Sequence, residues 1–184
     1  MTPSERLLTM LAERSAKRGN FTLASGRQST LYVDCRLTTM SPDGLATIGP
    51  LGLAAIREAG WTPDAIGGLT LGADPVSYAI AHASALAGTP VRAFTVRKEA
   101  KTHGTGKLIE GPYRSGDRVV VIEDVITTGG SALKAVEAVR AAGGTVLGVL
   151  AVVDREEGGV EAIRAAGLES IAMARASEIV ARMP

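Results

Sequence analysis

Residues 119–131 read Val119-Val120-Val121-Ile122-Glu123-Asp124-Val125-Ile126-Thr127-Thr128-Gly129-Gly130-Ser131, a run of apolar residues that stops at two acids and continues into hydroxyls and glycines. The four β-branched residues predict a central parallel strand, and an apolar stripe after Ser131 predicts a helix (Ala132, Leu133, Ala135, Val136, Val139). The loop between them therefore lies at the amino end of a helix, where free backbone N–H groups and the helix dipole bind anions. We expect a phosphate monoester to bind there.

The side chains of this stretch suit a sugar phosphate. Two acids precede the loop, and their carboxylates can accept hydrogen bonds from vicinal ribose hydroxyls or hold Mg²⁺ through water. The loop itself supplies hydroxyl donors and glycines that let the backbone approach an anion: Thr127, Thr128, Ser131, Gly129 and Gly130. The simpler alternative is an acidic strand end followed by an ordinary turn. A Walker loop is disfavoured because no Gly-Lys-Ser/Thr ends the turn, and a dinucleotide fingerprint because no G-x-G-x-x-G opens the helix.

The composition predicts one α/β domain over residues 1–184. Hydrophobic residues make up 46% of the chain and aromatic residues only 3%, as is typical of parallel sheets covered by helices with small side chains. A formal net charge of +1 gives no electrostatic reason to expect nucleic acid or an anionic membrane as partner. The single cysteine, Cys35, is expected to be a buried filler; it excludes an internal disulfide and fits a reducing cytoplasm. No apolar run is long enough to span a bilayer.

The first sixty residues do not follow a regular pattern. Thr2-Pro3-Ser4-Glu5 predicts a helix start, with an end near residues 17–19. Residues 20–40 are expected to be extended and irregular. Ser41-Pro42 starts a second helix that ends at Gly60. We expect residues 1–40 to form a small hood over the strand ends of an α/β core, residues 41–184.

From Pro63 onward, strands and helices alternate. The predicted strands are residues 65–71, 91–96, 118–125, 146–153 and 171–174, and the predicted helices are residues 75–87, 131–142, 160–166 and 178–182. This alternation predicts a central parallel sheet with helices on both faces.

The stretch from Glu123 to Ser131 resembles the phosphoribosyl-diphosphate (PRPP) motif of the type I phosphoribosyltransferases. A cationic segment, residues 97–111, supports this resemblance. It contains four cations and one of two histidines, with almost no apolar face. Taken alone it is a solvated surface hairpin, but beside a PRPP site a closing loop of this kind would stabilise the departing pyrophosphate and exclude water.

Three further segments narrow the resemblance to the orotate phosphoribosyltransferases. Residues 97–104 resemble the catalytic loop of that family, residues 21–29 with Tyr32-Val33-Asp34 its N-terminal signature, and residues 154–159 its strand-end arginine motif. Together with the PRPP motif these segments span most of residues 20–160 in the family's order.

The resemblance implies transfer of ribose 5-phosphate from PRPP to orotate, with Mg²⁺ bound through PRPP and water and no direct protein ligand. It implies a homodimer that shares the 97–111 loop across its interface. The implied catalytic residues are Lys101, His103 and Asp124. The implied PRPP-binding residues are Arg97, Lys98, Lys101, His103, Glu123, Asp124, Val125, Ile126, Thr127, Thr128, Gly129, Gly130 and Ser131. The implied diphosphate loop is Gly72, Ala73 and Asp74, and the implied orotate-binding residues are Tyr32, Val33, Thr127 and Arg155.

The chain departs from the family pattern at two positions. Many relatives carry a lysine in the diphosphate loop and another at the position of Ala24, and this chain has neither. Magnesium then matters more, with Asp74 a candidate outer-sphere partner. Two alternatives remain open: a PRPP-binding regulator, which the near-neutral charge and the Lys101/His103 loop disfavour, and a transferase for a purine base, which Arg155 and the N-terminal block disfavour.

Overall fold

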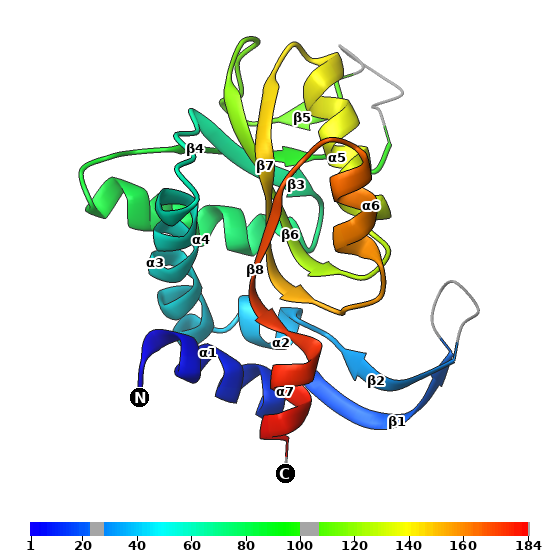
Figure 1. Cartoon of the computed structure of the whole chain (residues 1–184). Coiled ribbons are helices and arrows are strands. Elements are labelled where there is room, and N and C mark those ends of the chain that lie inside the picture. The colour runs from blue at the N-terminus through cyan, green and yellow to red at the C-terminus, as the bar shows by residue number, and fades with distance from the viewer. Residues whose placement is uncertain (23–27, 100–106, 184) are drawn as a thin grey trace.

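The structure is a computed structural model that describes residues 1–22, 28–99 and 107–183. Its centre is a six-stranded sheet of order β5-β4-β3-β6-β7-β8 (Figure 1). The strands are β3 (Ala65–Leu69), β4 (Arg92–Val96), β5 (Ile109–Glu110), β6 (Arg118–Ile126), β7 (Thr145–Asp154) and β8 (Ser170–Arg175). All pairs are parallel except β4 with β5, which is antiparallel. The predicted parallel sheet is confirmed, with an unpredicted edge strand too short to give a periodic pattern.

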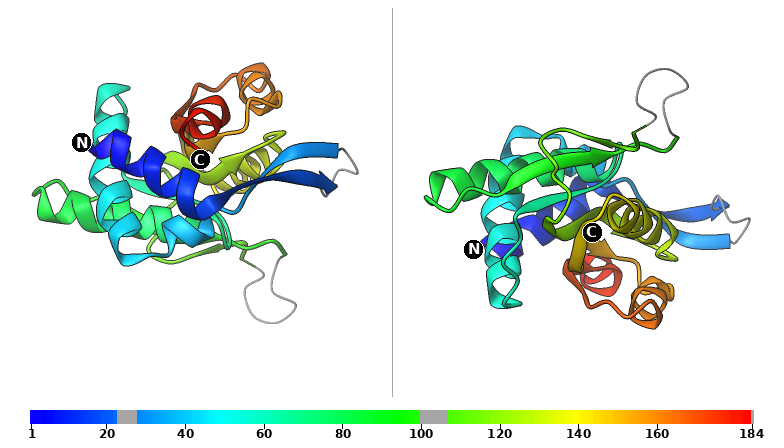
Figure 2. Two further views of the ribbon diagram at one scale, coloured as in Figure 1. Left: turned by 90° about the horizontal axis from the view of Figure 1, so that it is seen from below. Right: turned by 90° about the horizontal axis from the view of Figure 1, so that it is seen from above.

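Helices cover both faces of the sheet (Figures 1 and 2). On one face lie α3 (Pro42–Glu58) and α4 (Ala73–Leu86); on the other lie α5 (Gly130–Ala141) and α6 (Gly159–Ala165). Successive side chains of strand β6 point to opposite faces of the sheet and so contribute to two hydrophobic cores. Val120 and Ile122 belong to the core on the α3/α4 side, and Val119 and Val121 belong to the core on the α5/α6 side. This central strand, buried on both faces, holds Glu123 and Asp124 near its end.

The N-terminal region lies beyond the strand ends. Helix α1 (Pro3–Met10) starts at Thr2 with the predicted capping box and continues as a π-helical turn, η1 (Leu11–Ser15). The prediction that this helix reaches residues 17–19 is wrong, because β1 (Ala16–Thr22) pairs there with β2 (Gln28–Val33) in an antiparallel hairpin. The hairpin projects from the body in Figures 1 and 2.

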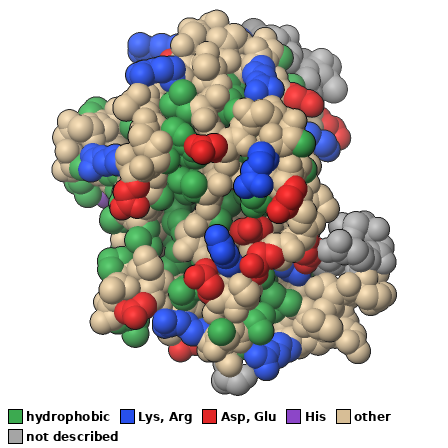
Figure 3. Space-filling model, viewed as in Figure 1, with side chains coloured by type: hydrophobic (Ala, Val, Ile, Leu, Met, Phe, Trp, Pro, Cys, Tyr) green, Lys and Arg blue, Asp and Glu red, His purple; other side chains and the backbone are tan. Residues whose placement is uncertain are grey.

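Two short helices complete the chain. An unpredicted helix, α2 (Arg36–Thr39), follows β2, and α7 (Ala176–Arg182) follows β8 and contacts α1. Cys35 is buried with a free thiol, as expected. On the face shown in Figure 3, acidic and basic side chains are intermixed. Within the described residues, no helix is long and apolar enough to cross a bilayer.

Candidate active site

A cavity of about 300 Å³ lies where the loops after the central strands meet the hood. Strands β3, β4, β6 and β7 are parallel, so their carboxyl ends meet at one edge of the sheet. The cavity is lined by residues 32–36 of the hood, the 69–72 loop, Lys98, residues 123–125 and Ser131. A smaller pocket of about 70 Å³ adjoins it and is lined by Glu123 and residues 125–132. The fold therefore brings together four segments that are far apart in the sequence.

The smaller pocket has the features of a phosphate site. Helix α5 begins at Gly130, after Gly129 in the left-handed conformation with φ of +82°, and no side chain of the described residues caps it. A Cβ at position 129 would lie 2.9 Å from the Gly159 carbonyl oxygen, so both the backbone conformation and the packing require glycine. The first N–H groups of the helix have no intrahelical acceptors and are donors for an anion. Exposed Thr128 and Ser131 add hydroxyls at the same place.

The acidic pair before this loop carries less charge than its composition indicates. Glu123 is 5% exposed, and its Oε1 accepts a hydrogen bond of 3.2 Å from the Asp124 N–H. Burial raises the pKa of Glu123 to about 9, helped by the hydrogen bond to the Asp124 side chain and by the charge of that carboxylate. Glu123 is therefore protonated at neutral pH and can donate as well as accept hydrogen bonds. The half-buried Asp124 accepts at Oδ1 from the Val125 N–H at 2.9 Å.

The loop after β3 touches the acidic pair. Helix α4 begins at Ala73, its N-cap is Gly72, and here too no side chain of the described residues caps the helix. The Thr70–Leu71 peptide bond in this loop is cis. A Cβ on Gly72 would collide with the Asp124 carboxylate, so glycine is needed for the two loops to approach this closely. Of the three predicted diphosphate-loop residues, only Gly72 lines the cavity.

Asp74 requires a correction. Its side chain is 9% exposed, and its two oxygens accept hydrogen bonds from Thr70 Oγ1 at 2.6 Å and Thr95 Oγ1 at 2.8 Å. Ala73 beside it is fully buried. The expectation that the Asp74 carboxylate is an outer-sphere partner of magnesium is not supported, because that carboxylate joins α4 to β4 and does not line the cavity.

The predicted orotate residues lie on the hood side of the site. Tyr32 is 40% exposed, lines the cavity beside Val33, and packs on Phe21 with ring centroids 5.4 Å apart. Arg155 is 7% exposed and does not line the cavity. Its Nη2 donates to Leu31 O at 2.9 Å and Glu157 Oε1 at 2.7 Å, so it ties the end of β7 to the hood.

The cationic segment is described only in part. Lys98 is exposed and lines the cavity, and Arg97 forms an ion pair of 3.6 Å with Glu110. Lys101, His103 and the Ala24 position lie outside the described residues.

Sequence reasoning missed several residues of the cavity: Asp34, Cys35, Arg36 and Thr70. An acid and a cation two residues apart, within the stretch expected to be extended and irregular, were the available signal for Asp34 and Arg36. These two residues form an ion pair of 2.8 Å at the cavity.

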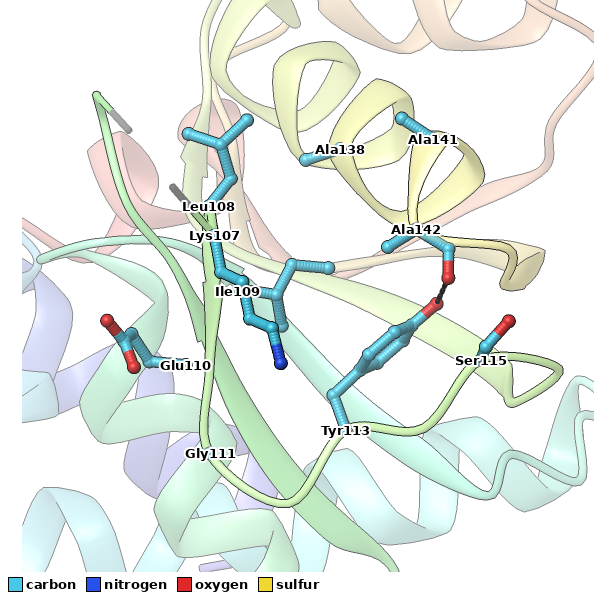
Figure 4. Close-up of a pocket in the computed structure, with 10 residues that line it drawn as sticks. All are labelled: Lys107, Leu108, Ile109, Glu110, Gly111, Tyr113, Ser115, Ala138, Ala141 and Ala142. Carbon is cyan, nitrogen blue, oxygen red and sulfur yellow. Dashed lines mark hydrogen bonds between the residues drawn. The ribbon is translucent and has the colours of Figure 1, made fainter. Parts of the chain in front are cut away.

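Two further cavities are lined by none of the described residues that were named as PRPP or orotate contacts. One of about 520 Å³ lies between residues 107–115 and the end of α5 (Figure 4). There Tyr113 donates to the Ala142 carbonyl at 3.3 Å and fixes the segment to the helix. Another, of about 570 Å³, is a largely apolar groove between α3 and α4.

Comparison with known proteins agrees with this geometry. The family model described as a phosphoribosyl transferase domain matches residues 45–166. The chain is 46% identical to the orotate phosphoribosyltransferase of Aquifex aeolicus over 98% of this chain and 99% of that protein. It is 51% identical to that of Mycobacterium avium over 89% of each chain. A crystal structure of the Mycobacterium tuberculosis orotate phosphoribosyltransferase in complex with PRPP superposes with a TM-score of 0.82, at 42% identity, and covers 97% of this chain and 99% of that one.

Proposed function

The chain belongs to the phosphoribosyltransferase family, among the orotate phosphoribosyltransferases, and we propose that it works through the cavity at the strand ends. It is an enzyme that transfers the ribose 5-phosphate group of PRPP to orotate, giving orotidine 5′-monophosphate and pyrophosphate in pyrimidine synthesis. The observation that carries the site assignment is the meeting of two helix N-termini, after Gly129 and Gly72, on either side of the Glu123–Asp124 pair.

PRPP spans the two pockets in this proposal. Its 5′-phosphate lies in the small pocket against residues 125–131, and its ribose hydroxyls face Glu123 and Asp124. Its diphosphate lies against Gly72 and Lys98 in the larger cavity, with Arg97 nearby. The positive ends of two helices and a cation then surround the charged groups of one substrate.

Catalysis in this site is mainly electrostatic. Bond breaking leaves positive charge on the ribosyl group and increases negative charge on the leaving diphosphate. Asp124 faces the ribosyl group, and Lys101 and His103 of the 97–111 loop are proposed to stabilise the diphosphate. Lys101→Ala should therefore lower kcat by about 10²-fold or more, with a smaller effect on KM. A change in KM alone would contradict this role.

Magnesium is part of the proposal. Among the described residues no group of three His, Cys, Asp or Glu side chains is placed to hold a metal ion. Mg²⁺ prefers oxygen ligands and keeps several waters, so the Asp124 carboxylate at the cavity suits contact through water while PRPP oxygens bind the ion directly. When bound, the ion neutralises part of the diphosphate charge.

Orotate is proposed to lie between the ribose and the hood, against Tyr32, Val33, Thr127 and Arg155. The Arg155 Nε has no acceptor among the described residues, which leaves one buried donor near the base side of the site. Arg155→Leu should lower orotate use sharply while PRPP affinity changes little. Uracil, which lacks the carboxylate, should lose far less, and equal losses for both bases would place Arg155 in a structural role.

A homodimer completes the proposal. Leu71, which lines the cavity, is 52% exposed, and Tyr78 of helix α4 is 53% exposed, so a second copy that covers Leu71 would lie next to the site. Mixing inactive Lys101→Ala and Asp124→Asn proteins should then restore part of the activity, because some hybrid dimers hold one intact site. No recovery despite demonstrated subunit exchange would show that the loop works within its own subunit.

The decisive assay follows orotate absorbance with PRPP and Mg²⁺, beside adenine, hypoxanthine and uracil. Turnover of orotate alone supports the proposal. PRPP binding without turnover of any base would support a regulator, and turnover of a purine would support the other transferase.

The cytoplasmic location, supported by the buried free thiol of Cys35, is testable by fractionation.

A further inference from the structure

Arg36 is a cation at the cavity with no role in the assignments above. It is the first residue of α2, which starts three residues after the last residue of the hood strand β2, and it lines the larger cavity. Among the described residues that line this cavity, only Arg36 and Lys98 are cationic, whereas Asp34, Glu123 and Asp124 are acidic. A substrate that carries a phosphate and a diphosphate is strongly anionic, so a second cation in the lining of this cavity suits it.

Asp34 holds Arg36 beside the cavity. The Arg36 Nε donates to Asp34 Oδ1 at 2.8 Å and its Nη2 donates to Oδ2 at 2.9 Å, a bidentate pair. The Arg36 side chain is 48% exposed, so water competes with this pair and its net stabilisation is small. Its Nη1 has no hydrogen bond to a described residue. The Arg36 guanidinium can therefore bind a second anion through Nη1 while it keeps its ion pair with Asp34.

We propose that Arg36 binds the diphosphate of PRPP and supplies positive charge there beside Lys98. The inference rests on the proposed placement of PRPP in this cavity. Arg36 shares the cavity with the 69–72 loop and Lys98, the proposed diphosphate contacts, and also with Tyr32 and Val33, two of the proposed orotate contacts, so the test below must separate the two ligands. A planar guanidinium suits bidentate contact with phosphate oxygens. Asp34 is the positioning residue for Arg36.

The test measures binding of three ligands by calorimetry: PRPP, pyrophosphate and orotidine 5′-monophosphate. The last holds the same ribose and 5′-phosphate without a diphosphate. Arg36→Gln should raise the Kd of PRPP and of pyrophosphate by about 10- to 100-fold, the effect of losing a hydrogen bond to a charged group. The Kd of orotidine 5′-monophosphate should not change, and Arg36→Lys should restore part of the loss.

The matched control is Arg14→Gln. Arg14 also forms a bidentate pair with a carboxylate, donating from Nη1 and Nη2 to Asp43 at 2.8 and 2.7 Å; it is 39% exposed and does not line the cavity. It should leave all three affinities unchanged. If Arg36→Gln does not fold, Arg36→Lys is measured in its place. It keeps the positive charge but loses the bidentate geometry, so it should still weaken the binding of PRPP and pyrophosphate and leave that of orotidine 5′-monophosphate unchanged.

Two results would overturn the inference. Weaker binding of orotidine 5′-monophosphate with unchanged PRPP would place Arg36 against the base, and unchanged binding of all three ligands would make it a surface ion pair only. These outcomes differ from failure of the proposed function, which would be PRPP binding by the wild-type protein without turnover of orotate.

Discussion

The loop after β6 and the loop after β3 both leave a parallel strand of the sheet, and both start an uncapped helix from a glycine, Gly129 and Gly72. Each also has an acid nearby, and the two acids point in different directions. Asp124 lines the cavity, whereas Asp74 is buried between the hydroxyls of Thr70 and Thr95. Similar backbone geometry at two strand ends therefore does not give a carboxylate the same role. The hydrogen-bond donors that surround each carboxylate decide whether it stabilises the fold or faces substrate.

The largest effect expected from this comparison is on catalysis. Asp124→Asn should lower kcat/KM by about 10²-fold or more, because a carboxylate that faces the ribosyl group loses its charge. PRPP binding should weaken as well, while the variant should remain folded. Steady-state kinetics and urea unfolding of the same variant measure both. Full activity in a stable variant would remove Asp124 from the site.

The next effect is the pH dependence of stability. The pKa of Glu123 is raised to about 9 in the folded protein from an ordinary value of 4.5, mainly by burial. Between these two pH values the unfolded chain has lost a proton that the folded chain keeps. The free energy of unfolding should therefore fall as pH rises through this window, by up to about 1.4 kcal/mol per pH unit.

Glu123→Gln removes this titration and should flatten the pH dependence. Asp124→Asn should flatten the pH dependence in part, because the Asp124 carboxylate also raises the pKa of Glu123, although less than burial does. Urea unfolding at several pH values compares the three proteins. A wild-type curve as flat as that of Glu123→Gln would show that Glu123 is not buried as a neutral acid.

Asp74→Ala tests the other acid, and here we expect a loss of stability with substrate affinity retained. It removes hydrogen bonds to two threonine hydroxyls and should lower the free energy of unfolding by about 2 to 4 kcal/mol. Substrate affinity should hold in the protein that remains folded. The control Asp43→Ala removes a carboxylate that is only partly buried and pairs with Arg14, and it should change stability far less. Loss of PRPP binding in a stable Asp74→Ala variant would place this acid in the site after all.

The smallest effect expected is at the glycines of the two loops. Gly72→Ala forces a Cβ into the Asp124 carboxylate and should cost about 1 to 3 kcal/mol of stability, with some loss of activity. Gly130→Ala is the counterpart in the other loop, where the nearest atom to a new Cβ is Thr128 Oγ1 at 3.9 Å. Its stability should stay within about 0.5 kcal/mol of wild type. Equal losses in thermal unfolding would contradict the close contact of the two loops.

Much of residues 41–184 was predictable because its elements follow local patterns. Alternating strands and helices, glycines after helices and the capping pattern at Ser41 are readable over short windows, and the observed boundaries lie close to the predicted ones. The N-terminal hood was less predictable. Residues 16–19 continue a helical pattern, yet they form a strand because β2, ten or more residues later, supplies their hydrogen-bond partners.

The sequence by itself determined the strand, acidic pair and glycine loop of residues 119–131, because strand burial, helix start and anion donors all arise within one short segment. Only the tertiary structure decided which side chains face the cavity. Asp74 is turned inward by Thr95, which lies 21 residues away, and Arg36 is brought to the cavity by the hood. The protonation of Glu123 also depends on the whole fold, since burial by distant segments sets its pKa. Contacts between remote segments and the loss of water around a charge leave no local pattern in a sequence.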